Sequence, residues 1–229
     1  MLISSFQCFL ETLKSHPVID ISVAKGTCVS LDLSVENTEL KQVNVSSSKD
    51  LEAYIWNYMK QNNAKLAFGG YLEQRGIYQR SDYFNQLNKE TERNIHIGLD
   101  LWIEANTAIF SPLKGTIHSF KNNTNYGDYG PTIILKHKIE EFEFYTLYGH
   151  LSLASIENLK VGAEVKQGEQ IANLGTAEVN GDYPPHLHFQ IIKDIQDYKG
   201  DYPGVSNQVD LEFYKLNCPD PNLLLKLNS

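Results

Sequence analysis

The run of residues 94–102 constrains the fold most, because its apolar and polar side chains alternate without exception up to Leu101. An extended strand has a side-chain period of two, so one face of this run is expected to meet a core and the other an open cleft. The cleft face carries His96, Gly98 and Asp100. A histidine and a carboxylate therefore point the same way, with a glycine between them that leaves room for a shared ligand. We interpret the pair as part of a divalent metal site, although such a pair on a strand is also typical of a simple surface hydrogen bond.

Two later runs repeat this arrangement. One ends in Tyr148-Gly149-His150, and the other carries His186 and His188 on one face, with apolar residues at the intervening positions. Four histidines and one aspartate thus predict a cleft floored by a sheet. A catalytic zinc site typically takes three protein ligands, and the surplus histidines suit general acid–base work. Spacing alone leaves open which of His150, His186 and His188 would bind the metal.

Length and composition exclude several classes of protein. The chain has 229 residues, of which 41% are hydrophobic, so one domain with an appendage is expected. A formal net charge of -8 argues against nucleic acid or an anionic membrane as the partner. No apolar run approaches the ~20 residues that span a bilayer. The first residues lack the basic region and cleavage site of a signal peptide, so we expect a cytoplasmic location, with export by another route left open.

The chain is expected to divide near residue 65. Residues 1–65 predict a small α/β element without a chemical motif: a helix with an apolar stripe ended by Pro17, strands over 18–23 and 29–33, and a second helix after the serines at 46–48. Residues 66–229 predict short strands joined by turns, without β-α-β alternation. The expected fold class is therefore α+β with a mainly antiparallel sheet. A hairpin of 132–138 with 143–148, a strand on each side of a bend at Ser111-Pro112, a strand over 171–174, a loop over 194–207 and a helix over 221–227 complete this prediction.

The three motifs resemble the signatures of peptidase family M23, the lysostaphin/LytM-type zinc metallopeptidases. These are His96-x-Gly98-x-Asp100, Tyr148-Gly149-His150-Leu151 and His186-Leu187-His188-Phe189. The similarity runs from about residue 68 to 192 and includes the glycines between the motifs. It implies a lysostaphin-like β-sheet domain that acts as a zinc-dependent endopeptidase and hydrolyses a peptide or amide bond, in either a peptidoglycan-like peptide or another short peptide.

The resemblance also implies roles for individual residues. By position, the ligands of one zinc ion per chain would be His96, Asp100 and His188, while His150 and His186 would be the catalytic histidines. Two further residues are candidates for substrate or oxyanion binding from their own positions. Tyr148 lies two residues before His150 and is expected on the same strand face, although it also suits simple packing. Arg75 lies in the irregular stretch 71–84, which suits either a functional loop or a surface loop with ordinary ion pairs.

The sequence departs from the family in the approach to His186. Residues 179–185 are bulkier and stiffer than the usual glycine-rich segment, which argues against a polyglycine substrate. A closer resemblance is to the M23-type domain within larger cytosolic proteins that combine a phosphotransferase with an aminotransferase; it is carried by residues 68–71, 80–82, 126–131 and 218–222. The alternative function is a non-catalytic or non-wall metal-binding module acting with a partner. Residues 1–65 would then provide the contact with that partner or with a second copy of the chain.

Overall fold

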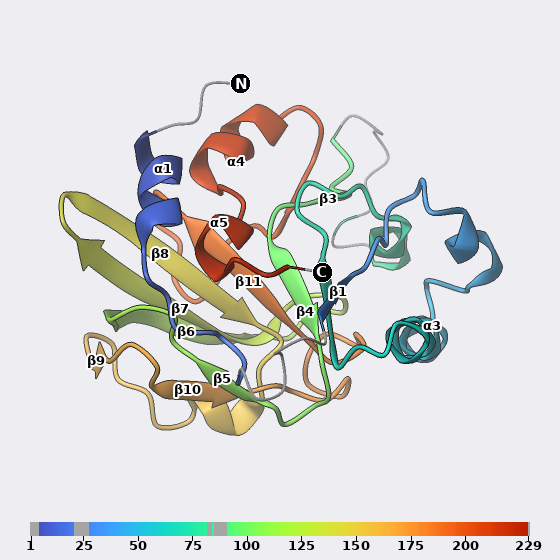
Figure 1. Ribbon diagram of the computed structural model, residues 1–229, viewed down its shortest axis with the longest axis horizontal. Coiled ribbons are helices and arrows are strands. Elements are labelled where there is room, and N and C mark those ends of the chain that lie inside the picture. The colour runs from blue at the N-terminus through green and yellow to red at the C-terminus, as the bar shows by residue number, and fades with distance from the viewer. Residues whose placement is uncertain (1–4, 21–27, 82–83, 85–90, 229) are drawn as a thin grey trace.

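The structure is a computed structural model that describes residues 5–20, 28–81, 84 and 91–228. Its main element is an eight-stranded sheet, central in Figure 1. The strand order across this sheet is β1 (Cys28–Ser30), β2 (Leu66–Gly69), β4 (Leu99–Trp102), β11 (His186–Ile192), β8 (Phe142–Gly149), β7 (Gly130–Ile139), β6 (Gly115–Asn123) and β9 (Glu164–Val165). Every neighbouring pair is antiparallel except β1 and β2, which run parallel. The predicted α+β class with a mainly antiparallel sheet is confirmed, as is the β7–β8 hairpin.

Two short two-stranded sheets flank the main one. β5 (Ala108–Phe110) pairs with β10 (Gln170–Asn173), and β3 (Ile95–His96) pairs with β12 (Val205–Ser206). The single strand predicted over 94–102 is therefore divided. Its first part pairs with β12, and its second part, β4, enters the main sheet. The change of partner follows Ile97, whose backbone N–H donates to Gly204 O at 2.9 Å and so continues the register with β12 by one residue.

The described helices are α1 (Ser5–Thr12), α3 (Ser48–Gln61), α4 (Leu211–Asn217) and α5 (Asn222–Leu225), with 3-10 turns η1 (Thr38–Gln42), η2 (Gly76–Arg80) and η3 (Leu153–Ile156). α3 begins where the serines predicted it, because the Ser47 hydroxyl accepts a hydrogen bond from Asp50 N at 3.2 Å and caps the first turn. α4 has no counterpart in the sequence prediction. Only Leu211 and Asn217 of its seven residues are buried, so it carries no apolar stripe.

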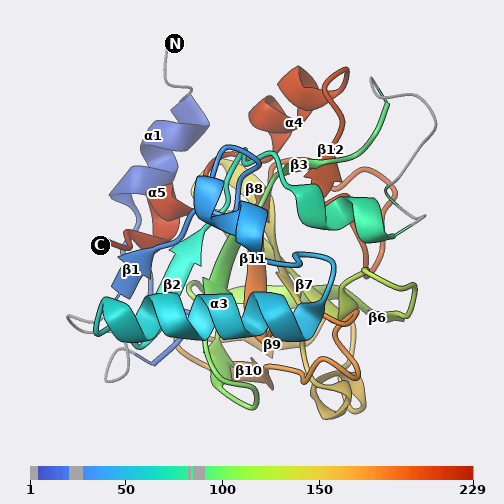
Figure 2. The ribbon, with the colours of Figure 1, turned by 90° about the vertical axis from the view of Figure 1, so that its right-hand side faces the viewer.

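The two faces of the main sheet have different coverings. The larger core lies on the face covered by α1 and α5, where Phe6 and Phe9 of α1 pack on Phe142 and Phe144 of β8. The opposite face carries two smaller apolar clusters, one under α3 and one around Tyr202. Figure 2 shows α3 running across this second face. Polar side chains of β4 and β11 lie between the two smaller clusters, and they form the site described below.

Residues 1–65, where described, contact both faces. α1 packs on one face and α3 on the other, while β1 extends the edge of the sheet beside β2. Of the strand predicted over 18–23, only the part up to Asp20 lies within the described residues, where Ile19 forms a single bridge with Ile109. None of the helices in the described part of the chain has the length and apolar character needed to cross a membrane.

Candidate metal centre

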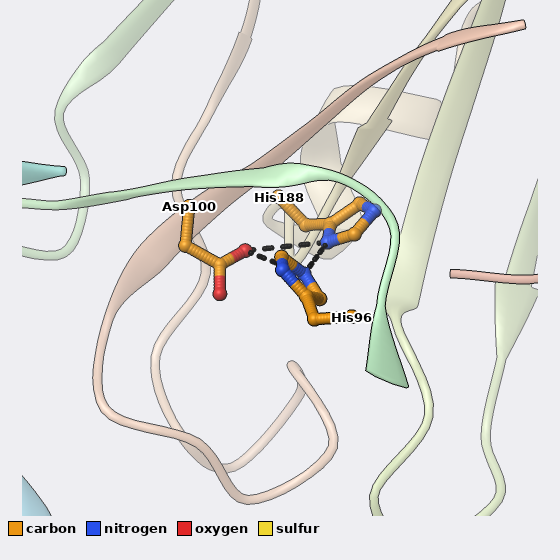
Figure 3. A group of neighbouring side chains, drawn as sticks. All are labelled: His96, Asp100 and His188. Atoms are coloured by element: carbon orange, nitrogen blue, oxygen red, sulfur yellow. Dashed lines mark hydrogen bonds and ion pairs between the residues drawn. The ribbon is translucent and has the colours of Figure 1, made fainter. Parts of the chain in front are cut away.

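Three side chains predicted as metal ligands converge on one point (Figure 3). His96 comes from β3, Asp100 from β4 and His188 from β11, where Asp100 and His188 are directly paired across the two strands. His96 Nε2 lies 2.8 Å from His188 Nδ1, and Asp100 Oδ1 lies 3.3 Å from the former and 3.2 Å from the latter. All three side chains are buried.

Gly98 provides the space that the strand pattern indicated. A Cβ atom at this position would lie 2.4 Å from His188 Cε1, closer than two carbon atoms can approach without a shift. The imidazole of His188 therefore occupies the volume that any larger residue at 98 would fill. The third ligand candidate reaches the first two because the intervening residue has no side chain.

Neighbouring groups assign the tautomers of both histidines. His96 Nδ1 lies 2.9 Å from Gly70 O, which only accepts, so this nitrogen carries the proton and Nε2 presents a lone pair. His188 Nε2 lies 3.1 Å from Gln190 Oε1, and the Gln190 amide nitrogen in turn donates to Pro203 O and the Cys218 sulfur. His188 Nδ1 is therefore the unprotonated nitrogen. Two imidazole lone pairs and one carboxylate oxygen thus face each other without a proton between them.

Asp100 uses its two oxygens differently. Oδ1 faces the histidines, whereas Oδ2 accepts a hydrogen bond from Arg75 Nη1 at 2.5 Å, and Arg75 Nε donates to Glu73 Oε2 at 2.5 Å. Glu73 Oε1 accepts from the backbone N–H of Leu33 at 2.9 Å. Burial opposes ionisation of Asp100, but His96 and the Arg75 guanidinium together hold the pKa of that carboxyl well below its usual value. Asp100 is therefore a fixed anion that offers one oxygen to the site.

His150 and His186 lie beside the three converging residues. Their rings are 4.2 Å apart between centroids, and His186 Nε2 lies 3.7 Å from Asp100 Oδ1. His150 Nδ1 donates to Asn180 O and His186 Nδ1 to Pro184 O, each at 2.7 Å, so both Nε2 atoms carry lone pairs. Burial lowers the pKa of both imidazoles, with their like neighbours adding to the effect at His150. Both are neutral near pH 7 and able to accept a proton.

The structure does not bring Tyr148 to the site, and its expected place on the same face as His150 is wrong. Tyr148 is paired with Ile133 and Phe189, whose side chains belong to the large core on the α1 face. Its hydroxyl lies 3.0 Å from Thr146 Oγ1 within that core. β8 ends at Gly149, and His150 has a left-handed backbone with φ of 61°, so the alternation of faces does not continue to His150. The turn after Gly149 redirects His150 into the cleft.

Arg75 reaches the site and lines the cavity, and its role in substrate or oxyanion binding stays a prediction. Two of its nitrogens are bound to Glu73 and Asp100, and the third, Nη2, is buried without a hydrogen-bond partner. Arg75 also lies over the ring of Trp102, 5.6 Å from its centroid. Arg75 thus contacts Asp100 through Oδ2, the carboxylate oxygen that does not face the histidines.

The converging residues line a cavity of about 160 Å³. Its walls include groups that the sequence prediction did not identify, namely Trp102, Tyr129, Tyr183 and, from the N-terminal segment, Leu33 and Leu51. The Tyr129 hydroxyl lies 3.4 Å from His188 Nε2. Gln190, which orients His188, shares the strand face of His186 and His188, so the period of two could have identified it.

The donor set fits zinc. Bonds of about 2.0–2.2 Å in a tetrahedral site separate neighbouring donor atoms by about 3.4 Å. The three donor atoms here are 2.8–3.3 Å apart, close to one face of such a tetrahedron, and the facing lone pairs have no other cation to satisfy them within the described residues. Two imidazoles and one carboxylate are typical ligands of a catalytic zinc site, which keeps its fourth position open.

Fold and site together define a β-sheet domain with a candidate metal-binding group of the His-Asp-His type in its cleft. The family model of peptidase family M23 matches residues 94–200, and this part of the chain is a domain of that family. The matched residues include the His96–Asp100 pair, His150, His186 and His188. No curated protein matches the chain in sequence.

Several solved structures resemble part of the chain. The catalytic domain of the antimicrobial peptidase lysostaphin from Staphylococcus simulans is 24% identical over 53% of this chain and 80% of its own, with a TM-score of 0.36. A zinc-containing peptidase from Vibrio cholerae is 25% identical over 45% of this chain and 31% of its own, with a TM-score of 0.35. The catalytic domain of the prophage-encoded M23 protein EnpA from Enterococcus faecalis is 21% identical over 56% of this chain and 86% of its own, with a TM-score of 0.37. This chain thus spans less than a third of the Vibrio protein.

Proposed function

We propose that this protein is a zinc-dependent peptidase that hydrolyses a peptide or amide bond. In this proposal His96, Asp100 and His188 hold one zinc ion, and His150 and His186 carry protons. The observation that carries the proposal is the convergence of two imidazole lone pairs and one carboxylate oxygen within 2.8–3.3 Å of each other in a buried cleft. Without a cation, such an arrangement has three electron-rich atoms facing each other out of water, which is unfavourable.

A bound zinc ion supplies Lewis acidity, which activates water and polarises a carbonyl group. The residues of the chain provide the rest. Asp100 stays anionic because Arg75 holds its second oxygen, and its charge favours the cation. Gly70 O and Gln190 Oε1 keep the ligand nitrogens unprotonated and the rings in place.

His150 and His186 transfer protons in this scheme. Both line the cavity with Nε2 unprotonated, so either can accept a proton from the attacking water. Once protonated, the same nitrogen is a donor to the developing oxyanion or to the departing amine. The Asn180 and Pro184 carbonyls stabilise each imidazolium, because they accept from the opposite ring nitrogen.

Turnover with controlled metal content tests this proposal. The zinc-loaded chain is incubated with a mixture of short peptides, and new termini are identified by mass spectrometry. We expect cleavage that a chelator abolishes and added zinc restores, and none from His188→Ala. Lys215→Ala is the matched control, because the Lys215–Glu212 ion pair lies on α4 away from the cleft and its loss leaves cleavage unchanged. Zinc binding without cleavage of any peptide would instead support a binding module, and cleavage that resists the chelator would contradict the metal role.

A further inference from the structure

The five polar side chains at the floor of the cleft are almost completely buried. The exposed fractions of His96, Asp100, His188, His150 and His186 are 1%, 1%, 2%, 4% and 5%. An enzyme that cuts the interior of a polymer needs room for extended chain on both sides of the bond, and each extended residue adds about 3.3 Å. The elements that cover this floor therefore decide which substrates can reach it.

α3 covers the surface next to His186. Across the sheet, His186 is paired with Trp102, and Trp102 with Ala67. Leu51, Ile55 and Met59 of α3 form one apolar cluster with Ala67 and Trp102, and Leu51 also lines the cavity (Figure 2). The N-terminal segment thus occupies the sheet surface on which an extended substrate would continue past His186.

A set of polar contacts, which we call the clasp, closes the cleft on the same side as α3. The clasp joins Ser48, Arg80, Asp182, Tyr183 and residues 126–127. Ser48 Oγ donates to Asp182 Oδ1 at 2.8 Å, and Arg80 Nη2 donates to Asp182 O at 2.6 Å. The Arg80 guanidinium also lies 4.4 Å from the centroid of the Tyr183 ring, and the Tyr183 hydroxyl donates to Gly127 O at 2.9 Å.

The clasp is in direct contact with the catalytic histidines. The centroid of the Tyr183 ring is 5.2 Å from that of His150 and 5.8 Å from that of His186. The contacts tie the segment before β11 to the start of α3, to η2 and to the turn before β7. On this side the cleft therefore ends at the packed ring of Tyr183, directly next to the two histidines.

The size of the remaining space agrees with this closure. A water molecule takes up about 30 Å³ in the liquid, so the cavity of about 160 Å³ has room for roughly five waters. That is the space of a short peptide segment. It is too small for an extended chain that passes through on both sides.

We infer that the cleft accepts short peptides or the free end of a longer peptide, and excludes the interior of a polymer. The inference rests on the proposed function, because it names the substrate of the same site. It assigns to α3 and the clasp the role of a specificity determinant: they close the cleft beyond His186 and His150.

Matched peptides of two lengths test the inference. One set contains dipeptides and tripeptides with free ends; the other contains the same bonds within octapeptides that are acetylated and amidated. Octapeptides blocked at one end only show which terminus is accepted. Cleavage is followed by mass spectrometry and binding by calorimetry, both on the zinc-loaded full chain. We expect kcat/KM for the short set to exceed that for the doubly blocked set by at least about tenfold, equivalent to about 1.4 kcal/mol.

Variants of the clasp make the test specific. Arg80→Ala removes the contacts with Asp182 and Tyr183, and Ser48→Ala is a milder change that leaves the Ser47 cap of α3 intact. Both are expected to raise binding and cleavage of the blocked octapeptides relative to the short peptides, whereas Lys215→Ala keeps the wild-type ratio. If Arg80→Ala fails to fold, Ser48→Ala decides the question.

The outcomes separate this inference from the proposed function. Equal cleavage of short and doubly blocked long peptides by the wild-type chain would overturn the inference and leave the peptidase proposal standing. Binding of short but not long peptides without any turnover would support the closed cleft and contradict the peptidase proposal. Absence of binding by every peptide, with zinc present, would overturn the inference.

Discussion

Asp100 shows how much of the site depends on a residue behind it. Arg75 lies between Glu73 and Asp100 and is itself only 5% exposed. Arg75→Met would leave two carboxylates without a cation in a water-poor environment. Removing one partner of a buried ion pair typically costs about 3–5 kcal/mol, so we expect a loss of this size in the free energy of unfolding of the metal-free chain, measured in urea.

An exposed ion pair is the control for this prediction. Lys136 and Glu143 are 2.9 Å apart, with side chains 38% and 46% exposed. Lys136→Met is expected to cost less than about 1 kcal/mol. Similar losses in the two variants would mean that the buried chain of charges does not stabilise the fold.

The two histidines outside the ligand set should separate metal binding from turnover. His150→Ala and His186→Ala remove groups that line the cavity but do not belong to the set of three converging donors. General acid–base groups typically contribute about 10²–10⁴-fold, so kcat should fall by this factor while zinc content and unfolding midpoint stay near those of the wild type. Release of zinc from either variant would make that histidine a ligand instead.

At the residue scale, strand periodicity and motif order were sufficient to predict which side chains meet. The structure brings together His96, Asp100, His188, His150 and His186, as the sequence indicated. Tyr148 could not be placed correctly, because the left-handed turn at His150 depends on the tertiary environment rather than on the local pattern. The hydrogen bond from Arg75 to Asp100 could not be predicted from the sequence either, since the two residues are 25 positions apart.

At the scale of elements, α1 is predicted to stabilise the sheet without taking part in the metal site. Phe9 of α1 stacks on Phe142 of β8 at 4.3 Å between centroids and is 8% exposed. Phe9→Ala should lower the free energy of unfolding by about 3–5 kcal/mol, as for other buried phenylalanines, and leave the zinc content unchanged. Phe213→Ala on α4 is the control, because Phe213 is 47% exposed and should cost far less. Loss of zinc from a folded Phe9→Ala protein would mean that the N-terminal segment contributes to the site.

Local signals predicted elements well where the partner is close in sequence. The β7–β8 hairpin, the bend between β5 and β6, and the start of α3 follow from alternation, turn residues and capping. Two features depend on distant partners and were not predicted. These are the parallel pairing of β1 with β2 and the change of partner between β3 and β4. The residue pattern within these strands does not indicate which distant strand each one pairs with.

At the scale of the whole molecule, buried histidines make stability depend on pH. Burial lowers the pKa of His137 to about 4, and its ring nitrogens contact Lys114 O and Thr146 Oγ1 at 2.8 Å. In the unfolded chain this group titrates near 6.5, so between about pH 6.5 and 4 the unfolded state binds more protons than the folded state. Stability from this residue is therefore complete above about pH 6.5 and is lost as the pH falls toward 4.

His137→Gln tests this dependence. Urea unfolding of the metal-free wild type and variant at pH 7.5 and 4.5 gives the loss on acidification for each. The wild type should lose about 2–3 kcal/mol more than the variant, since one pKa unit corresponds to about 1.4 kcal/mol. An equal loss in the two proteins would show that His137 is accessible to protons in the folded state.

Zinc content per chain tests the central claim most directly. Elemental analysis compares the wild type with His188→Ala and His186→Ala, each purified and dialysed in the same way. The geometry predicts one zinc ion per chain in the wild type and in His186→Ala, and loss of the ion from His188→Ala, because only His188 places a lone pair against His96 and Asp100. A His188→Ala protein that keeps as much zinc as the wild type would contradict the assigned metal centre.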